Sequence, residues 1–144
     1  MMQRYVIDSS VFNKLYLDEA DRDKAQQLFI QAAESDVKLL APDLLYLEVI
    51  NTAQRCGVPI DSVVDLLDAQ QYLIDIRAVN NTERKKAIEI IANGHVKSGY
   101  PSIYDALFHA MALCNNAVFV TADKRHYAKT KMLGNICLLS KISF

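Results

Sequence analysis

The sequence predicts an α/β protein in which helices cover both faces of a central, mainly parallel sheet of four to five short strands. Short apolar runs alternate along the chain with longer segments in which apolar residues recur every three or four positions. Consecutive strands are thus separated by helical segments, as crossover connections between parallel strands require. The 144 residues are enough to bury a substantial core, and we expect one domain over residues 1–144.

The expected strands and helices follow from these patterns. The apolar runs predict strands at 4–8, 37–42, 74–79, 117–120 and 136–139. Helical spacing predicts helices at 9–17, 21–35, 42–57, 60–73, 80–100, 102–116 and 123–132. We expect Pro42 at a first helical position and Gly57 just past the helix end. Asn81 or Thr82 is the expected cap of the 80–100 helix, which should fray near Gly94 or Gly99, and Ser102 caps the next helix.

Composition excludes several classes of protein. With 51% hydrophobic residues and a net charge of −1, the chain is neither disordered nor uniformly basic. The charge is nevertheless divided, because residues 1–76 hold 13 acidic and 6 basic residues whereas residues 77–144 hold 4 and 10. The three cysteines are widely spaced, which argues against a disulfide framework or a zinc site. Neither a signal peptide nor a membrane span is indicated, so we expect a soluble cytoplasmic protein.

Four acidic residues stand where a carboxylate is costly. Asp8 and Asp123 each follow an apolar strand, and sites in parallel sheets form at such carboxyl ends. Glu48 and Asp105 lie among apolar residues on helices, so their side chains are expected to turn inward. A helix N-cap is an equally good explanation of Asp8 or of Asp123 taken alone.

A cation is required if the four carboxylates meet. Each like-charged pair at about 4 Å would cost about 4 kcal/mol at an effective dielectric constant near 20. The set is all oxygen, without cysteine or histidine at metal-binding spacing, which favours Mg²⁺ or Mn²⁺ over zinc. Mg²⁺ keeps several waters and binds one or two carboxylates together with substrate phosphate, so an acidic pocket of this kind suits phosphodiester chemistry.

Four motifs, whose acids are 40, 57 and 18 positions apart along the chain, resemble those of a known family. They are "VIDSSVF" with Asp8, "LEVIN" with Glu48, "YDALFHAMA" with Asp105, and "FVTADKRHY" with Asp123. In this order they resemble the PIN-domain ribonucleases, and in particular the VapC-type toxins of toxin–antitoxin pairs. The resemblance implies a PIN-like α/β/α fold, RNA cleavage that depends on Mg²⁺ or Mn²⁺, a homodimer, and a small VapB-like antitoxin partner.

The same resemblance suggests roles for individual residues. Asp8, Asp105 and Asp123 would hold Mg²⁺, and Glu48 would bind a second ion or position the attacking water. Ser9, Asn51 and Thr121 would support the acids by hydrogen bonding, with helix capping or satisfaction of a strand end as the simpler alternative. The positive charge of the second half separately suggests that Lys124 and Arg125, with Lys129 and Lys131 nearby, form a basic rim that binds RNA, with a solvated helix face as the simpler alternative.

Other interpretations compete with this one. A phosphatase of the haloacid-dehalogenase-like class would need an aspartate at position 10, where the chain has Ser10. A catalytically idle PIN-like domain that binds RNA or protein is the main alternative. His109 departs from the family pattern; it either packs in the interior or caps, or it orients Asp105, four residues before it, or contacts substrate. Apolar residues of the first half, among them Phe12 and Phe29, form either core or a surface for a dimer or an antitoxin.

Overall fold

Five parallel strands form the centre of the protein, for which a computed structural model describes residues 2–144. They are β1 (Gln3–Ile7), β2 (Val37–Pro42), β3 (Ile74–Arg77), β4 (Val118–Thr121) and β5 (Ile136–Leu138). Their order in the sheet is β3-β2-β1-β4-β5. The predicted sheet of four to five mainly parallel strands is therefore confirmed.

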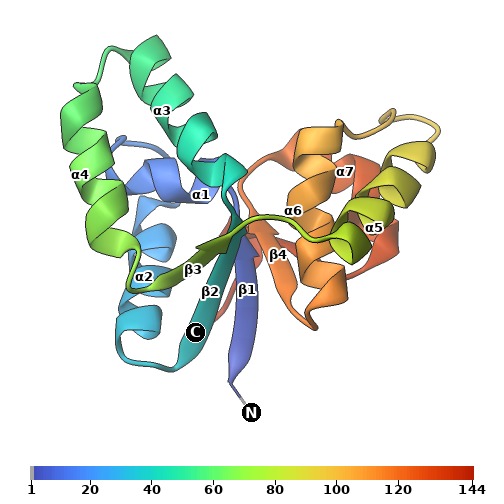
Figure 1. Ribbon diagram of the computed structural model, residues 1–144, viewed down its shortest axis with the longest axis horizontal. Coiled ribbons are helices and arrows are strands. Elements are labelled where there is room, and N and C mark those ends of the chain that lie inside the picture. Colours follow the sequence, from blue (N-terminus) through green and yellow to red (C-terminus); the bar gives the residue numbers. More distant parts are fainter. Residues whose placement is uncertain (1) are drawn as a thin grey trace.

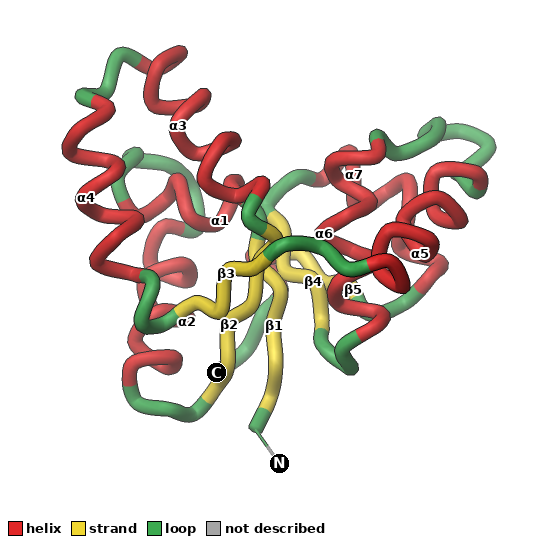
Figure 2. The backbone as a smooth tube through the Cα atoms, viewed as in Figure 1, coloured by secondary structure: helices red, strands yellow, loops and turns green. Residues whose placement is uncertain are grey.

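Helices cover both faces of this sheet (Figures 1 and 2). One side carries α1 (Ser9–Phe12), α2 (Arg22–Ala33), α3 (Leu44–Cys56) and α4 (Ile60–Gln70). The other carries α5 (Asn81–Ala92), α6 (Ile103–Cys114) and α7 (Lys124–Thr130). Short 3₁₀ turns follow at Asn13–Leu15, Lys131–Leu133 and Leu139–Lys141. No helix within residues 2–144 is long and apolar enough to cross a bilayer.

The strand order places a switch point between β1 and β4. The chain runs from β1 outward through β2 to β3, then returns to β4 on the other side of β1 and ends at β5. Ile7 pairs with Val120, so the residues that follow these two positions leave the same edge of the sheet. Open α/β sheets bind ligands at such a point.

The structure corrects several element boundaries. The helix expected at 80–100 ends at Ala92, and backbone hydrogen bonds between His95 and Gly99 then close a turn. Its N-cap is Asn80, one residue before the expected position, because Asn80 and Glu83 form a reciprocal capping box. Pro42 is the last residue of β2 and lies outside α3. The helix expected at 9–17 is α-helical only to Phe12.

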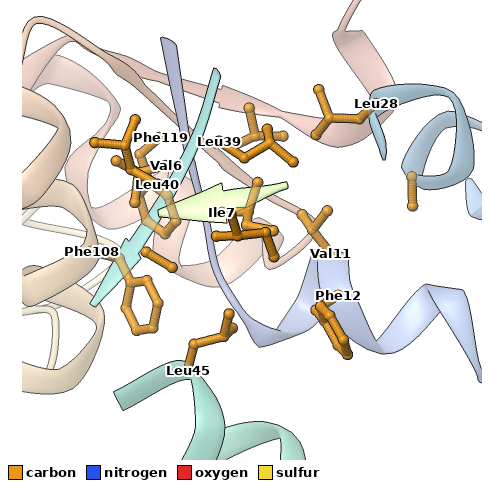
Figure 3. Packing of buried hydrophobic residues seen from close by; sticks show 14 of the residues in the cluster. Val6, Ile7, Val11, Phe12, Leu28, Leu39, Leu40, Leu45, Phe108 and Phe119 are labelled. Atoms are coloured by element: carbon orange, nitrogen blue, oxygen red, sulfur yellow. The ribbon is translucent and has the colours of Figure 1, made fainter. Parts of the chain in front are cut away.

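The main core lies between the sheet and its helices (Figure 3). Phe12 packs edge-on against Phe29 at 6.0 Å between ring centroids, and both are buried. Phe108 stacks on Phe119 at the same distance on the other face. The apolar residues weighed above as a docking surface are therefore part of the core or packed against it.

A buried ion pair ties α5 to the sheet and to α6. Glu83 is fully buried and accepts two hydrogen bonds from the Arg77 guanidinium, at 2.8 and 2.7 Å. The Asn115 amide donates to the same carboxylate at 2.6 Å, and the Asn80 backbone N–H donates at 3.0 Å. One carboxylate thus joins the end of β3, the start of α5 and the end of α6.

Arg77→Ala should destabilise the protein, because it leaves the buried Glu83 carboxylate without its cation. We expect the free energy of unfolding to fall by about 2–3 kcal/mol, measured by urea denaturation. Lys86→Ala is the control, since it removes an exposed ion pair with Glu89 and should cost about 0.5 kcal/mol or less. Equal effects of the two substitutions would contradict this role for Arg77.

Candidate active site

Asp8 follows β1 at the switch point and is almost fully buried, with 7% of its surface exposed. The Ser10 hydroxyl donates to its Oδ1 at 2.5 Å, and the Thr121 hydroxyl donates to its Oδ2 at 2.7 Å. The Val11 backbone N–H also donates to Oδ1, so Asp8 does act as the N-cap of α1. Burial still dominates and raises the pKa of Asp8 to about 6, in spite of these hydrogen bonds.

Glu48 enters the site from the first turns of α3. Its side chain is half-buried, and the Ser9 hydroxyl donates to its Oε1 at 3.3 Å. Burial, followed by the negative charges of Asp8 and Asp105, raises the pKa of Glu48 to about 7. These charges act on Glu48 because the three carboxylates share one region of the protein.

Asp105 lies in the first turn of α6, where the Ser102 hydroxyl caps the helix by accepting from the Asp105 backbone N–H. Its Oδ2 is 3.8 Å from Nδ1 of His126 on α7. His126 is 2% exposed, and its Nδ1 is buried without a hydrogen-bond partner within residues 2–144. Burial lowers the pKa of His126, although the charges of Asp105 and Asp123 act in the opposite direction.

Asp123 follows β4 and caps α7. Its Oδ1 accepts from the backbone N–H groups of Arg125 and His126, at 2.9 and 3.2 Å. Its Oδ2 accepts no hydrogen bond from residues 2–144, and the residue is exposed. The Asp123 backbone N–H donates to Thr121 Oγ1, which in turn holds Asp8. Capping therefore occupies one carboxylate oxygen and leaves the other available.

The four acids are brought to the same end of the sheet, but not into contact with one another. Asp8, Glu48 and Asp105 influence one another electrostatically, and Asp123 is linked to Asp8 through Thr121. Within residues 2–144, no three Asp, Glu, His or Cys side chains are close enough together to form a metal site. The arrangement is a set of neighbouring carboxylates rather than a closed coordination shell.

The chemistry of this set fits a hard divalent cation. All the candidate ligands are oxygens, and two of the carboxylates have raised pKa values because burial and like charge oppose their ionisation. A divalent cation would favour the ionised forms and offset that cost. Asp8, Glu48, Asp105 and Asp123 are the residues that would hold it.

The other predicted residues differ in their burial and hydrogen bonding. Asn51 is exposed, and its side chain makes no hydrogen bond within residues 2–144. His109 is fully buried, and its Nε2 donates to the Gly134 carbonyl at 2.8 Å, so it packs in the interior and does not orient Asp105. Lys124 and Arg125 are exposed at the start of α7, next to Asp123.

Two residues of the site were missed from the sequence. Ser10 was considered only as a missing aspartate, yet its hydroxyl donates to Asp8 and accepts from the Ala122 backbone N–H at 2.9 Å. It therefore links the ends of β1 and β4. His126 approaches Asp105. The sequence clue to it was its position three residues after Asp123, in the first turn of the helix that Asp123 caps.

The fold is similar to those of several solved structures. The chain superposes on a toxin–antitoxin complex from Klebsiella pneumoniae with a TM-score of 0.65 and 13% identity, covering 96% of this chain and 99% of that one. VapBC2 from Rickettsia felis, bound to a promoter DNA fragment, gives a TM-score of 0.69 and 14% identity, with 94% and 97% covered.

VapC20 from Mycobacterium tuberculosis, described as a toxin that cleaves the sarcin–ricin loop, gives a TM-score of 0.64 and 14% identity, covering 86% of this chain and 93% of that one. These likenesses establish the fold. No curated protein sequence matches the chain. The PIN domain family model matches residues 5–132, which is most of the chain, so the protein belongs to the PIN domain family.

Proposed function

We propose that the protein is an endoribonuclease that hydrolyses RNA phosphodiesters with Mg²⁺ or Mn²⁺, and that it is the toxin of a toxin–antitoxin pair. The observation that carries this proposal is the set of neighbouring carboxylates at the switch point, two of them with raised pKa values. A catalytically idle domain would gain nothing from that arrangement, because it costs stability unless a cation is bound. Membership of the PIN family supports the nuclease assignment.

Each acid would contribute to holding the ion and the reacting water. Bound Mg²⁺ or Mn²⁺ would supply an activated water and stabilise negative charge on the phosphate. Asp8, Asp105 and Asp123 would hold the ion, and Glu48 would accept a proton from water or hold a second ion. Without a bound ion, burial and the charges of Asp8 and Asp105 raise the pKa of Glu48 to about 7, and a bound cation would lower it.

The hydroxyl groups around the acids would fix their orientation. Ser10 and Thr121 hold the two oxygens of Asp8, and Ser9 holds Glu48. Such supporting contacts commonly change metal affinity or activity by about 10- to 100-fold. No side chain is needed as a nucleophile.

RNA would approach over the basic part of the protein. Lys124 and Arg125 are exposed directly after Asp123, and the chain from residue 77 onward has an excess of basic residues. These cations would bind phosphates on either side of the cleaved bond. We also propose a homodimer and a small VapB-like antitoxin. Structural similarity to two toxin–antitoxin assemblies supports the antitoxin.

Asp8→Asn should abolish RNA cleavage, because an amide is a poor ligand for Mg²⁺. We expect the rate with Mg²⁺ or Mn²⁺ to fall by about 100-fold or more, measured on a labelled RNA. EDTA should stop the wild-type reaction, and added Mn²⁺ should restore it. Asp61→Asn, on the exposed surface of α4, is the control and should cleave normally. Cleavage that survives both Asp8→Asn and chelation would refute the proposed mechanism.

Asp8→Asn should also stabilise the protein when divalent ions are removed. The pKa values of Asp8 and Glu48 are raised in the folded protein, so folding favours the protonated forms of both groups. Their protonation therefore stabilises the fold at low pH, and this stabilisation is lost as pH rises from about 4 to about 7. In EDTA, the variant should match wild type near pH 4 and melt about 4 °C higher near pH 7.5.

Added Mg²⁺ should raise the melting temperature of the wild type but not that of Asp8→Asn. Differential scanning calorimetry at both pH values provides the measurement. A variant that is less stable than wild type at both pH values would show that the Asp8 carboxylate stabilises the fold without a cation.

A further inference from the structure

Asp105 differs from the other three acids in the support that its carboxylate receives. Within residues 2–144, Asp8 accepts three hydrogen bonds, Asp123 accepts two and Glu48 accepts one. The Asp105 carboxylate accepts none there, and its Oδ2 instead faces Nδ1 of His126 at 3.8 Å. Because supporting contacts fix the orientation of ligating carboxylates, the orientation of Asp105 depends on His126.

The ring of His126 is packed on several sides. The residue is 2% exposed, and its ring centroid lies 5.5 Å from that of Phe119 and 6.2 Å from that of His109. Its Nε2 is 3.4 Å from the hydroxyl of the fully buried Thr130, one helical turn later. Its Nδ1 is buried and has no hydrogen-bond partner in the described part of the chain. Native structures leave few buried polar atoms unpaired, and the Asp105 carboxylate is within 4 Å of this one.

The position of the hydrogen on the ring decides whether this approach is attractive. With a hydrogen on Nδ1, the ring presents a donor to the Asp105 carboxylate, whereas with a hydrogen on Nε2 alone a lone pair faces it. The second arrangement brings two acceptors together in a buried setting and is therefore unfavourable. The Thr130 hydroxyl is compatible with the first, because it lies near both Nε2 and the His126 carbonyl oxygen and can rotate to donate to the nitrogen.

The backbone of the same residue supports a second acid. The His126 backbone N–H donates to Asp123 Oδ1 at 3.2 Å. His126 therefore supports Asp123 through its backbone and approaches Asp105 through its ring, and so connects α7 with the first turn of α6. Only the second of these contacts depends on the side chain. A substitution at position 126 thus changes the support of Asp105 and keeps the backbone donor to Asp123.

We propose that His126 is a positioning residue, whose Nδ1–H donates to Asp105 Oδ2 and holds that carboxylate in place for a divalent cation. The Asp105 side chain is 38% exposed, and a movement of about 1 Å would bring the two atoms to hydrogen-bonding distance. The proposal rests on the metal-dependent function given above, and it adds to the four acids a residue that acts through one of them. A histidine that served packing alone would affect metal binding only as far as it affected stability.

Two substitutions at position 126 separate positioning from packing. His126→Phe keeps an aromatic ring but has no donor, whereas His126→Asn keeps an N–H at the position of Nδ1 and gives up the ring. His126→Phe should weaken Mn²⁺ binding by the full-length protein by about 10-fold or more, and His126→Asn should stay within about threefold of wild type. Isothermal titration calorimetry with Mn²⁺ alone gives the affinities.

Stability should follow the opposite order. His126→Asn leaves a cavity in the interior, so it should melt at a lower temperature than His126→Phe when both are measured in EDTA. The two orders together are the signature of a positioning role. A Mn²⁺ affinity that falls in step with the melting temperature would overturn the proposal, as would unchanged affinity in His126→Phe.

His109→Gln is the matched control, because His109 is a second fully buried histidine of the same cluster and shares α6 with Asp105. Its Nε2 donates to the Gly134 carbonyl, and a glutamine amide can keep that hydrogen bond. Mn²⁺ affinity should therefore stay within about twofold of wild type. A loss as large as that of His126→Phe would overturn the specific role of His126.

Nuclear magnetic resonance of the ring nitrogens in ¹⁵N-labelled wild type, without added metal, locates the hydrogen directly. A hydrogen on Nδ1 of His126 supports the proposal, and a hydrogen on Nε2 alone overturns it. This measurement needs no variant, so it decides the matter even if a substitution prevents folding. Circular dichroism of each variant verifies its fold.

The results also distinguish this inference from the proposed function. If wild type binds Mn²⁺ and cleaves RNA, and His126→Phe binds Mn²⁺ equally well, only the role of His126 is wrong. If wild type binds no Mn²⁺, the metal-dependent function fails, and the role of His126 fails with it.

Discussion

The burial of the Asp8 carboxylate between β1 and β4 is the constraint on which the site depends. Its oxygens are held by Ser10, in α1 just after β1, and by Thr121, the last residue of β4, so the carboxylate also joins the two strand ends at the switch point. A buried carboxylate without a nearby cation resists ionisation, and its pKa of about 6 expresses that cost. The surrounding hydroxyls orient the group but do not neutralise it.

The protein handles its two buried acid sites in opposite ways. Glu83 is fully buried, but Arg77, Asn115 and Asn80 donate to it, and its pKa is lowered. Asp8 and Glu48 have only hydroxyl and amide donors, and their pKa values are raised. The first arrangement is complete within the chain and stabilises the fold. The second would gain stability from a cation supplied from outside, which is the expected property of a binding site.

The fold and the acids could be predicted from the sequence because both depend on local patterns. The parallel sheet was predicted from apolar runs that alternate with segments of helical spacing. Asp8 and Asp123 were singled out because each follows an apolar strand. The turn after Ala92 was missed because its stability comes from hydrogen bonds between His95 and Gly99, which leave no mark in periodicity. Ser10 was missed because its contacts with Asp8 and Ala122 depend on how the ends of β1 and β4 come together. His126 was missed because its approach to Asp105 depends on how α6 and α7 pack.

The order of the strands also converts the charge division of the sequence into a spatial one. Residues 1–76 are acidic and build β1 to β3 with α1 to α4, whereas residues 77–144 are basic and build the helices on the other side (Figure 1). The acids lie where the two sides meet, since Glu48 belongs to α3 and Asp105 to α6. A polyanion is repelled by one side and attracted by the other. The topology would therefore orient an approaching polyanion, such as the proposed RNA substrate, toward α6 and α7, the elements that carry Asp105 and begin beside Asp123.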